Sequence, residues 1–194
     1  MSDFLNLSKD TDFLDLSKAA PNLKRLRGII SWDMHPVYKD SQSDGFDLDI
    51  FLFVLGADGK LSSPPDVCFF NNKVACGGAL TVPEDCRSGG SEYFTADLAK
   101  IPVDRTSFDV FVFLFEAEKR GQHFGMITNA KFVLVDPDDG DRVIQQYNIS
   151  QFTGDFALHV GSVVRKDSGW IFQPMGESGA VNPNEVAAGY RRNN

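Results

Sequence analysis

Apolar and polar residues alternate over short stretches along most of this chain, with the period of two that is typical of β-strands. Clusters of Gly, Pro, Asn and Asp separate these stretches and mark turns, for example at 56–60 and 167–169. A series of about eight or nine strands joined by turns predicts an all-β fold, with a β-sandwich or barrel as its architecture. Helical periodicity is scarce, and we expect only single helical turns at 116–123 and 185–190.

A short repeat opens the chain. DFLNLSK (3–9) returns as DFLDLSK (12–18), with Asn6 replaced by Asp15 as the one change. Each copy alternates Phe or Leu with polar residues, and the residues between the copies favour a turn. The repeat therefore predicts a pair of neighbouring or hairpin strands.

Three later segments predict a central strand, a long loop and a C-terminal tail. FDVFVFLFEA (108–117) is apolar on both faces, as expected of a central strand. The segment 73–91 has several turn signals and little periodicity, so we expect a long loop there. Beyond Gly176 the chain is polar and rich in Gly and Asn. We therefore expect one sandwich domain over residues 1–176 and a loosely packed polar tail over 177–194.

Charge and composition narrow the function classes. The 194 residues carry a net charge of −8, which argues against general binding to nucleic acid or anionic membranes. No signal peptide is visible, and no apolar run reaches the roughly 20 residues of a membrane span. We expect a cytoplasmic protein without direct membrane insertion. Cys68, Cys76 and Cys86 match neither a zinc pattern nor a disulfide framework, so free thiols are expected, with a Cys76–Cys86 bridge as the alternative.

The stretch Gly45-Phe46-Asp47-Leu48-Asp49 gives the first chemical signal. In a strand, Asp47 and Asp49 point to the same side, about 6.6 Å apart, and that side continues with the apolar residues Phe51, Phe53 and Leu55. Two like charges at the edge of a core repel each other and lose hydration unless a cation joins them. A hard cation held by oxygen ligands, calcium above all, would remove this cost. The alternative is that the strand begins in solvent and both carboxylates are hydrated.

Other oxygen-bearing side chains gather in the same part of the sequence, at the ends of predicted strands and around the long loop. Calcium takes about six to eight oxygens from carboxylates, amides, backbone and water. Strand ends on one rim of a sandwich can converge, so this set is a candidate ligand pool. Its members are Asp33, Asp47, Asp49, Asn71, Asn72, Glu84, Asp85 and Glu92.

Catalytic patterns are weak by comparison. The three histidines, His35, His123 and His159, lie in no recognisable nucleophile motif, and His159 alternates with apolar residues as an ordinary sheet side chain would. The chain also lacks a phosphate-binding glycine loop and a dinucleotide fingerprint. The Asp-rich stretch 138–141 is too short for an EF-hand loop and is expected to be a solvated turn. We therefore expect no enzyme activity.

The order of the motifs resembles that of a known family. LSKAAPNLKRLRGIISWD, GFDLDIFLFVLGADGK, FFNN and EAEKRGQHFGMITNAKFVLVD follow one another as in the TerD family of tellurium-resistance and bacterial stress-response proteins. The resemblance covers residues 5–176. It implies a calcium-binding β-sandwich of the cytoplasm, tied to tolerance of tellurite, phage and toxins. It also implies protein partners, either other stress-operon products or phage proteins, and no established enzyme activity.

The resemblance also implies a ligand set. The family motif residues are matched here by Asp33, Asp47, Asp49, Asn71 and Asn72, and Glu92 matches the last acid of the loop that follows. That loop differs from the usual acidic form of the family, because VPEDCRSGGSEYF retains few carboxylates. We therefore expect Ca²⁺ at one site rather than two. The leading hypothesis is a calcium-binding, non-catalytic stress-response domain, and the alternative is a β-sandwich interaction module with weak or lost metal binding.

Overall fold

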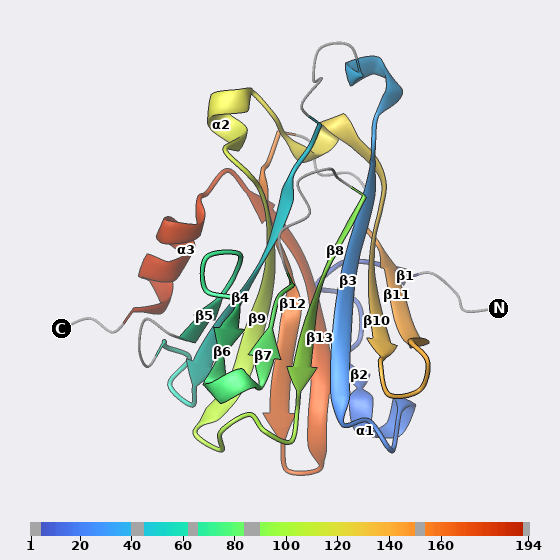
Figure 1. The fold of residues 1–194 in the computed structure, drawn as a ribbon, viewed down its shortest axis with the longest axis vertical. Coiled ribbons are helices and arrows are strands. Elements are labelled where there is room, and N and C mark those ends of the chain that lie inside the picture. The colour runs from blue at the N-terminus through green and yellow to red at the C-terminus, as the bar shows by residue number, and fades with distance from the viewer. Residues whose placement is uncertain (1–4, 40–44, 62–65, 84–89, 150–153, 192–194) are drawn as a thin grey trace.

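The computed structural model describes residues 5–39, 45–61, 66–83, 90–149 and 154–191, and two packed β-sheets dominate it (Figure 1). In the described ranges, one sheet has seven strands and the other has six. The seven-stranded sheet has the order β1 (Leu5–Asn6), β11 (Arg142–Asn148), β10 (Ile127–Asp136), β3 (Arg25–Met34), β8 (Ser91–Asp97), β7 (Leu80–Thr81) and β6 (Val74–Ala75). The six-stranded sheet has the order β2 (Leu14–Asp15), β13 (Gly169–Gly179), β12 (Ala157–Lys166), β9 (Arg105–Leu114), β4 (Leu48–Gly56) and β5 (Val67–Cys68).

Helices are few and short. The described residues form α1 (Leu16–Ala19), α2 (Ala117–Arg120) and α3 (Pro183–Tyr190), and the 3₁₀ helices η1 (Pro36–Tyr38), η3 (Cys76–Gly78) and η4 (Phe124–Met126). None of the helices in the described part of the chain is long and apolar enough to cross a membrane. The helical turns expected near residues 116–123 and 185–190 are confirmed as α2 and α3.

The all-β sandwich expected from the sequence is confirmed. Eight strands of seven or more residues account for the eight or nine that alternation predicts. Five further strands have two residues each. β1, β2 and β5 lie within segments where strands were expected, whereas β6 and β7 were not expected, because a two-residue pairing leaves too short a pattern to detect. The main core lies between the sheets, where Phe94 and Phe132 of one sheet face Phe108 and Phe172 of the other.

The central strands β4 and β9 of the six-stranded sheet are buried on both faces. Along β9, Phe108, Val110 and Val112 belong to the main core, whereas Phe111 and Phe113 belong to a second cluster on the opposite face. This second cluster also contains Phe51 and Phe53 of β4 and packs against residues of β5 and α3. The expectation that FDVFVFLF forms a central strand buried on both faces is therefore confirmed.

The two copies of the N-terminal repeat do not pair with each other. β1, from the first copy, pairs in parallel with β11, and β2, from the second copy, pairs antiparallel with β13 of the other sheet. The expectation of neighbouring or hairpin strands is wrong, because each copy finds an open edge of a different sheet. Close packing holds this segment down: a Cβ on Gly176 would lie 2.6 Å from the backbone oxygen of Leu7.

The expectation of a long loop over 73–91 is also wrong for its described residues. Val74–Ala75 and Leu80–Thr81 form the small strands β6 and β7, joined by η3, and β7 pairs with β8. Conversely, the strand expected at 66–72 shrinks to Val67–Cys68, because Phe69 and Asn72 already pair across a tight turn. Cys68 and Cys76 are free thiols, and Cys86 lies outside the described residues.

The C-terminal segment packs more closely than its polar composition predicts. β13 continues to Gly179, beyond the expected boundary at residue 176, and α3 lies on the outer face of the six-stranded sheet. Three contacts fix α3: the Leu61 amide donates to the Tyr190 carbonyl at 2.9 Å, Lys60 Nζ donates to the Gly189 carbonyl at 2.8 Å, and Tyr190 packs on Phe53. The expectation of loose packing is wrong for residues 177–191. The division into a domain and a tail stays a prediction.

Substituting Phe113 by Ala tests the second apolar cluster. Its side chain is 3 % exposed and packs edge-on against Phe51 and parallel to Phe111, so we expect the variant to lose about 3–5 kcal/mol of unfolding free energy. Phe13→Ala is the matched control, because Phe13 is 56 % exposed, and its effect should stay within about 0.5 kcal/mol. Urea unfolding measures both values, and equal losses would contradict the burial of this face.

Candidate metal centre

Two carboxylates stand at the start of β4 on one face of the strand, as the alternation predicts. Asp47 and Asp49 precede Phe51 and Phe53 on the outer face of the six-stranded sheet, and they are 8 % and 5 % exposed. Two carboxylates at this depth are poorly hydrated. The alternative in which both are simply hydrated at a solvent-exposed strand end is therefore wrong.

A third carboxylate comes from the other sheet. β8 places Phe94 and Ala96 in the core, and by alternation Glu92 points to the same side as these two residues. In the described ranges β5 pairs with β4 at Leu52 and Phe53, and no strand there pairs with the start of β4 on that side. Glu92 Oε2 accepts a hydrogen bond from the Ile50 amide of β4 at 3.2 Å, so one carboxylate joins the two sheets.

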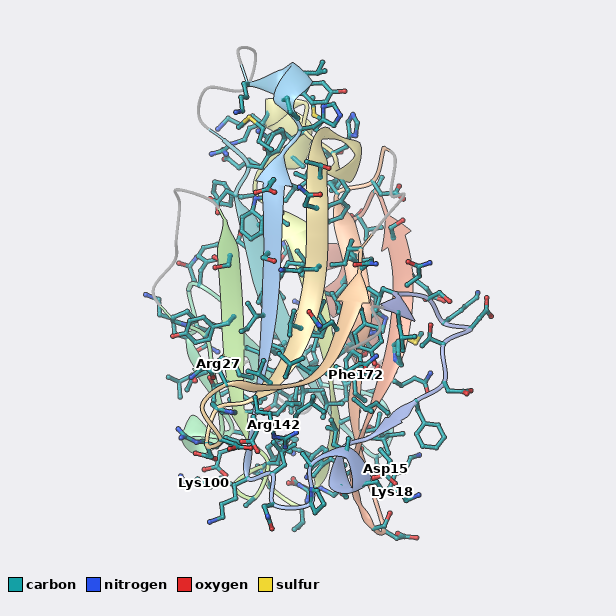
Figure 2. The ribbon with its side chains drawn as sticks, turned by 90° about the vertical axis from the view of Figure 1, so that its right-hand side faces the viewer. Asp15, Lys18, Arg27, Lys100, Arg142 and Phe172 are labelled. Atoms are coloured by element: carbon teal, nitrogen blue, oxygen red, sulfur yellow. The ribbon has the colours of Figure 1, made fainter. Side chains whose placement is uncertain are left out.

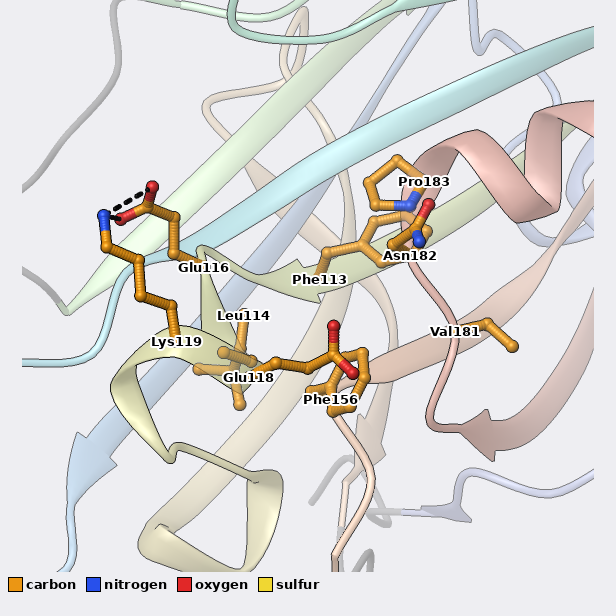
Figure 3. A pocket seen from close by; sticks show the side chains of 10 residues that line it. Phe113, Leu114, Glu116, Glu118, Lys119, Phe156, Val181, Asn182 and Pro183 are labelled. Atoms are coloured by element: carbon orange, nitrogen blue, oxygen red, sulfur yellow. Dashed lines mark hydrogen bonds and ion pairs between the residues drawn. The ribbon is translucent and has the colours of Figure 1, made fainter.

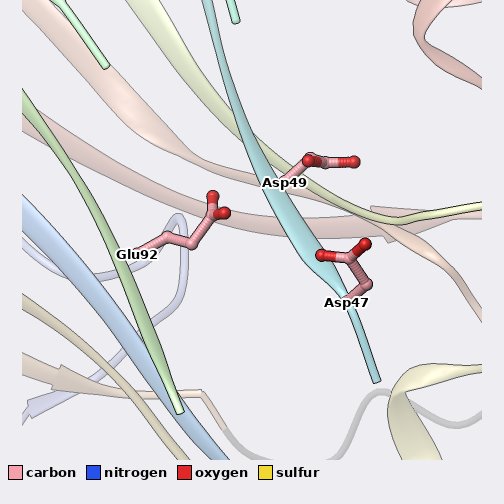
Figure 4. Close-up of side chains that lie close together, drawn as sticks. All are labelled: Asp47, Asp49 and Glu92. Atoms are coloured by element: carbon pink, nitrogen blue, oxygen red, sulfur yellow. The ribbon is translucent and has the colours of Figure 1, made fainter. Parts of the chain in front are cut away.

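The three carboxylates form one cluster (Figure 4). One oxygen from each of Asp47, Asp49 and Glu92 lies within 4.8 Å of the others. Two of these acids, Asp49 and Glu92, line a recess of about 10 Å³, on the scale of a single water molecule, together with Ile50, Phe70, Val82 and Pro83.

The donor set fits a hard divalent cation. The cluster offers only carboxylate oxygens, which suit calcium, magnesium or manganese, and it lacks the His and Cys ligands that zinc prefers. Three acids at this spacing repel one another in a poorly hydrated site, and a divalent ion offsets most of that charge. Calcium suits the set best, because it accepts irregular geometry and both monodentate and bidentate carboxylates.

The backbone before β4 is held by hydrogen bonds from the segment around α2. The Phe115 amide donates to the Asp47 carbonyl at 2.9 Å, and Gln122 Nε2 donates to the Gly45 carbonyl at 2.9 Å. Gln122 is 4 % exposed and follows α2, whose start at Glu116 adopts a left-handed backbone with φ of 47°. Gln122 of the EAEKRGQHFG motif and the neighbouring Phe115 thus hold the backbone that carries the two aspartates. Gln122 has this role although the sequence alone did not single it out.

The remaining expected ligands lie elsewhere. Asp33 is exposed on β3 and accepts a hydrogen bond from Asn129 Nδ2 at 2.9 Å. Asn71 is exposed at the turn, and Asn72 Nδ2 donates to the Val67 carbonyl at 2.7 Å. The structure therefore brings together three of the six ligands expected from the sequence. Glu84 and Asp85 lie outside the described residues.

The Asp-rich turn at 138–141 has its charges compensated by arginines. Arg25 pairs with Asp138, Arg27 with Asp141 at 2.7 Å, and Arg142 with Asp139 at 2.6 Å. The expected turn is confirmed, since it joins β10 to β11, but its carboxylates are engaged by guanidinium groups. Figure 2 shows Arg27 and Arg142 close together at this end of the sandwich.

A second buried polar group lies under α3, and the sequence analysis missed it. Asp109 is the one acid within FDVFVFLF, is 6 % exposed and faces the second apolar cluster. Its carboxylate accepts hydrogen bonds from Ser162 Oγ at 2.5 Å and from the Tyr190 hydroxyl, and His159 Nε2 lies 3.9 Å away. An acid within an apolar strand was the available signal, because a buried acid requires polar partners.

This second group differs from a nucleophilic triad. The serine hydroxyl bonds the aspartate directly, whereas in a triad the histidine stands between them. The His159 ring stacks on Phe111 with centroids 4.3 Å apart, and burial lowers its pKa from the usual 6.5, although Asp109 and Glu177 act in the opposite direction. Burial also raises the pKa of Tyr190 above its ordinary range, which keeps its hydroxyl a donor to Asp109. These contacts anchor α3 to the sheet.

Comparison with known proteins identifies one family. The TerD domain matches residues 4–190. The tellurium resistance protein TerD of Serratia marcescens is 28 % identical over 191 residues, which is 96 % of each chain. General stress protein 16U of Bacillus subtilis is 27 % identical, with 84 % of this chain and 85 % of that protein covered. The solved structure of a TerD homologue from Streptomyces coelicolor superposes with a TM-score of 0.67 at 21 % identity, covering 86 % and 96 % of the two chains.

The buried histidine makes stability depend on pH. Because the folded-state pKa of His159 lies below 6.5, the unfolded chain takes up a proton first as the pH falls. We expect the melting temperature to fall between pH 7 and pH 5.5, and we expect His159→Gln to reduce that fall. His35→Gln is the control for removing a histidine in another part of the chain, and we expect it to reduce the fall less than His159→Gln does. If His159→Gln kept the parent slope, this interpretation would be wrong.

Proposed function

This chain belongs to the TerD domain family, and from that membership we propose that it is a calcium-binding, non-catalytic domain of a bacterial stress response that acts through protein partners. Its relatives carry names of tellurium resistance and general stress, and we extend those roles to this chain as tolerance of tellurite and related stresses. A cytoplasmic location with other stress-operon or phage proteins as partners is part of the proposal.

The observation that carries the metal proposal is the convergence of Asp47, Asp49 and Glu92. Asp49 stands in β4, Asp47 immediately precedes that strand, and Glu92 belongs to β8, so a bound cation would connect the two sheets. When bound, calcium would supply positive charge and oxygen coordination. The residues of this chain supply the rest: they orient the carboxylates, exclude water with Phe70 and Pro83, and fix the backbone through Gln122.

A non-catalytic role is supported by how the reactive side chains are used. Ser162 and Tyr190 both donate to Asp109 under α3. Burial raises the pKa of the Cys68 thiol to about 12, so it stays protonated and unreactive at neutral pH. In this proposal Ser162, Tyr190 and Cys68 stabilise the fold, and the protein acts by binding a cation and protein partners.

A second candidate is an interaction module with weak or lost metal binding. It is favoured by the dispersal of Asp33, Asn71 and Asn72, which leaves three carboxylates as the cluster in the described part of the chain. Calcium titration by calorimetry separates the two candidates. One site of measurable affinity supports the first, two tight sites contradict the ligand assignment, and absence of binding supports the interaction module.

Calcium should stabilise the fold. At 100 times its dissociation constant, calcium is expected to add about 2.7 kcal/mol to the unfolding free energy. Magnesium should add less, because it demands a regular octahedron and releases its water reluctantly. Thermal unfolding in chelator, in calcium and in magnesium measures the difference. A melting temperature that is indifferent to all three would remove calcium from the proposal.

Single substitutions test the ligands. Asp47→Asn removes one charge from the cluster and should abolish most of the calcium-dependent rise in melting temperature. Asp33→Asn removes the same charge from the exposed side chain that bonds Asn129, and it should leave the calcium response unchanged. If Asp33→Asn lost the response and Asp47→Asn kept it, the geometry of the proposed site would be wrong.

A further inference from the structure

An open groove lies on the outer face of the six-stranded sheet, between α2 and the start of α3 (Figure 3). Its volume is about 260 Å³, and its apolar wall includes Phe113, Phe156, Val181 and Pro183. Phe156 is half-buried and Val181 is 37 % exposed, so apolar surface is accessible here. The groove is separate from the recess beside Glu92, which lies on the other side of β4.

One rim of the groove is negatively charged. Lys119 Nζ lies 3.1 Å from both carboxylate oxygens of Glu116, so these two charges compensate each other. Glu118 is exposed, and no ion pair engages its carboxylate within the described ranges. Figure 3 shows Glu118 extending from α2 toward Phe156. The groove therefore combines an aromatic wall with one uncompensated negative charge.

We propose that this groove is an anchor site for an arginine side chain of a partner protein. The guanidinium would pair with the Glu118 carboxylate and stack on the Phe156 ring, while the aliphatic stem and a neighbouring apolar side chain would cover Val181 and Pro183. Arginine fits better than lysine, because its planar group pairs with a carboxylate through two hydrogen bonds and stacks on aromatic rings.

The size of the groove supports a protein side chain as the occupant. Pockets that enclose a whole small ligand hold about 300–1,000 Å³, and this groove lies below that range. Arginine is also among the residues that dominate the binding energy of protein interfaces. An exposed ion pair contributes little by itself, so affinity would come from covering the apolar wall and selectivity from the charge.

The site is adjacent to the metal centre without depending on it. Phe113, on the groove wall, is the cross-strand partner of Asp49. A partner anchored here would lie next to the acidic cluster, but the charge of Glu118 and the apolar wall are present with or without a cation. Binding is therefore tested in chelator, and the failure of one proposal would leave the other standing.

The experiment is a nuclear magnetic resonance titration of the isotope-labelled full chain. The probes are acetyl-Leu-Arg-Leu-amide, the same tripeptide with neutral citrulline for arginine, and n-butylguanidinium. We expect the arginine tripeptide to shift the amide signals of residues 116–119 and 181–182, and to bind about threefold to fivefold more tightly than the citrulline tripeptide. We expect n-butylguanidinium to bind more weakly than the arginine tripeptide, because it covers less of the wall.

Matched variants complete the test. Glu118→Gln should remove the preference for arginine over citrulline. Asp167→Asn changes the net charge equally at an exposed turn on another part of the chain, and it should leave the preference intact. The proposal is overturned if arginine and citrulline peptides bind alike, if the shifts lie outside the groove, or if both variants act alike. Binding of n-butylguanidinium as tight as that of the tripeptide would also overturn it, in favour of a small-molecule cation site.

Discussion

Burial of β4 and β9, the central strands of the six-stranded sheet, on both faces is the constraint on which the rest of the structure depends. An antiparallel sheet usually leaves one face in water, whereas here β4 and β9 meet the main core on one side and the second phenylalanine cluster on the other. Both strands therefore carry continuous apolar sequences. The apolar outer face of β4 and β9 must also be shielded from water, and residues of β5 and of the C-terminal helix α3 pack against it as a cover.

The same constraint determines how every acid on these two strands behaves. Asp109 lies under the cover, and its two hydroxyl donors satisfy it without a counter-ion. Asp47 and Asp49 lie where the cover ends, in a neighbourhood that includes the further carboxylate of Glu92. A poorly hydrated acid that receives hydroxyl protons is stable alone, whereas three acids together favour a cation. Asp109 is therefore a structural acid, whereas Asp47 and Asp49 are candidate metal ligands, and the difference follows from where each lies on the outer face of the sheet.

In this protein, the sequence pattern predicts which segments form strands and which faces are buried better than it predicts which strands pair with each other. Alternation predicted the long strands, the common face of Asp47 and Asp49, and the double burial of 108–117, because each depends on side chains a few residues apart. It failed for the N-terminal repeat, since pairing with β11 or β13 is decided by which sheet edge is open. Glu92 was named from its resemblance to a family motif. Its approach to Ile50 depends on the distance between two sheets, which no single segment encodes.

The pairing of the repeat copies determines when this sandwich can be completed. β1 meets β11 at Leu5 and Tyr147, and β2 meets β13 at Leu14 and Phe172, so the first strands along the chain pair with some of the last. Contacts of such long sequence separation form late, because the entropy of closing the intervening loop opposes them. A growing chain would thus carry β1 unpaired until β11 had been synthesised, and β2 unpaired until β13 had been synthesised. The last step of folding would then be the closure of both sheet edges by one short segment.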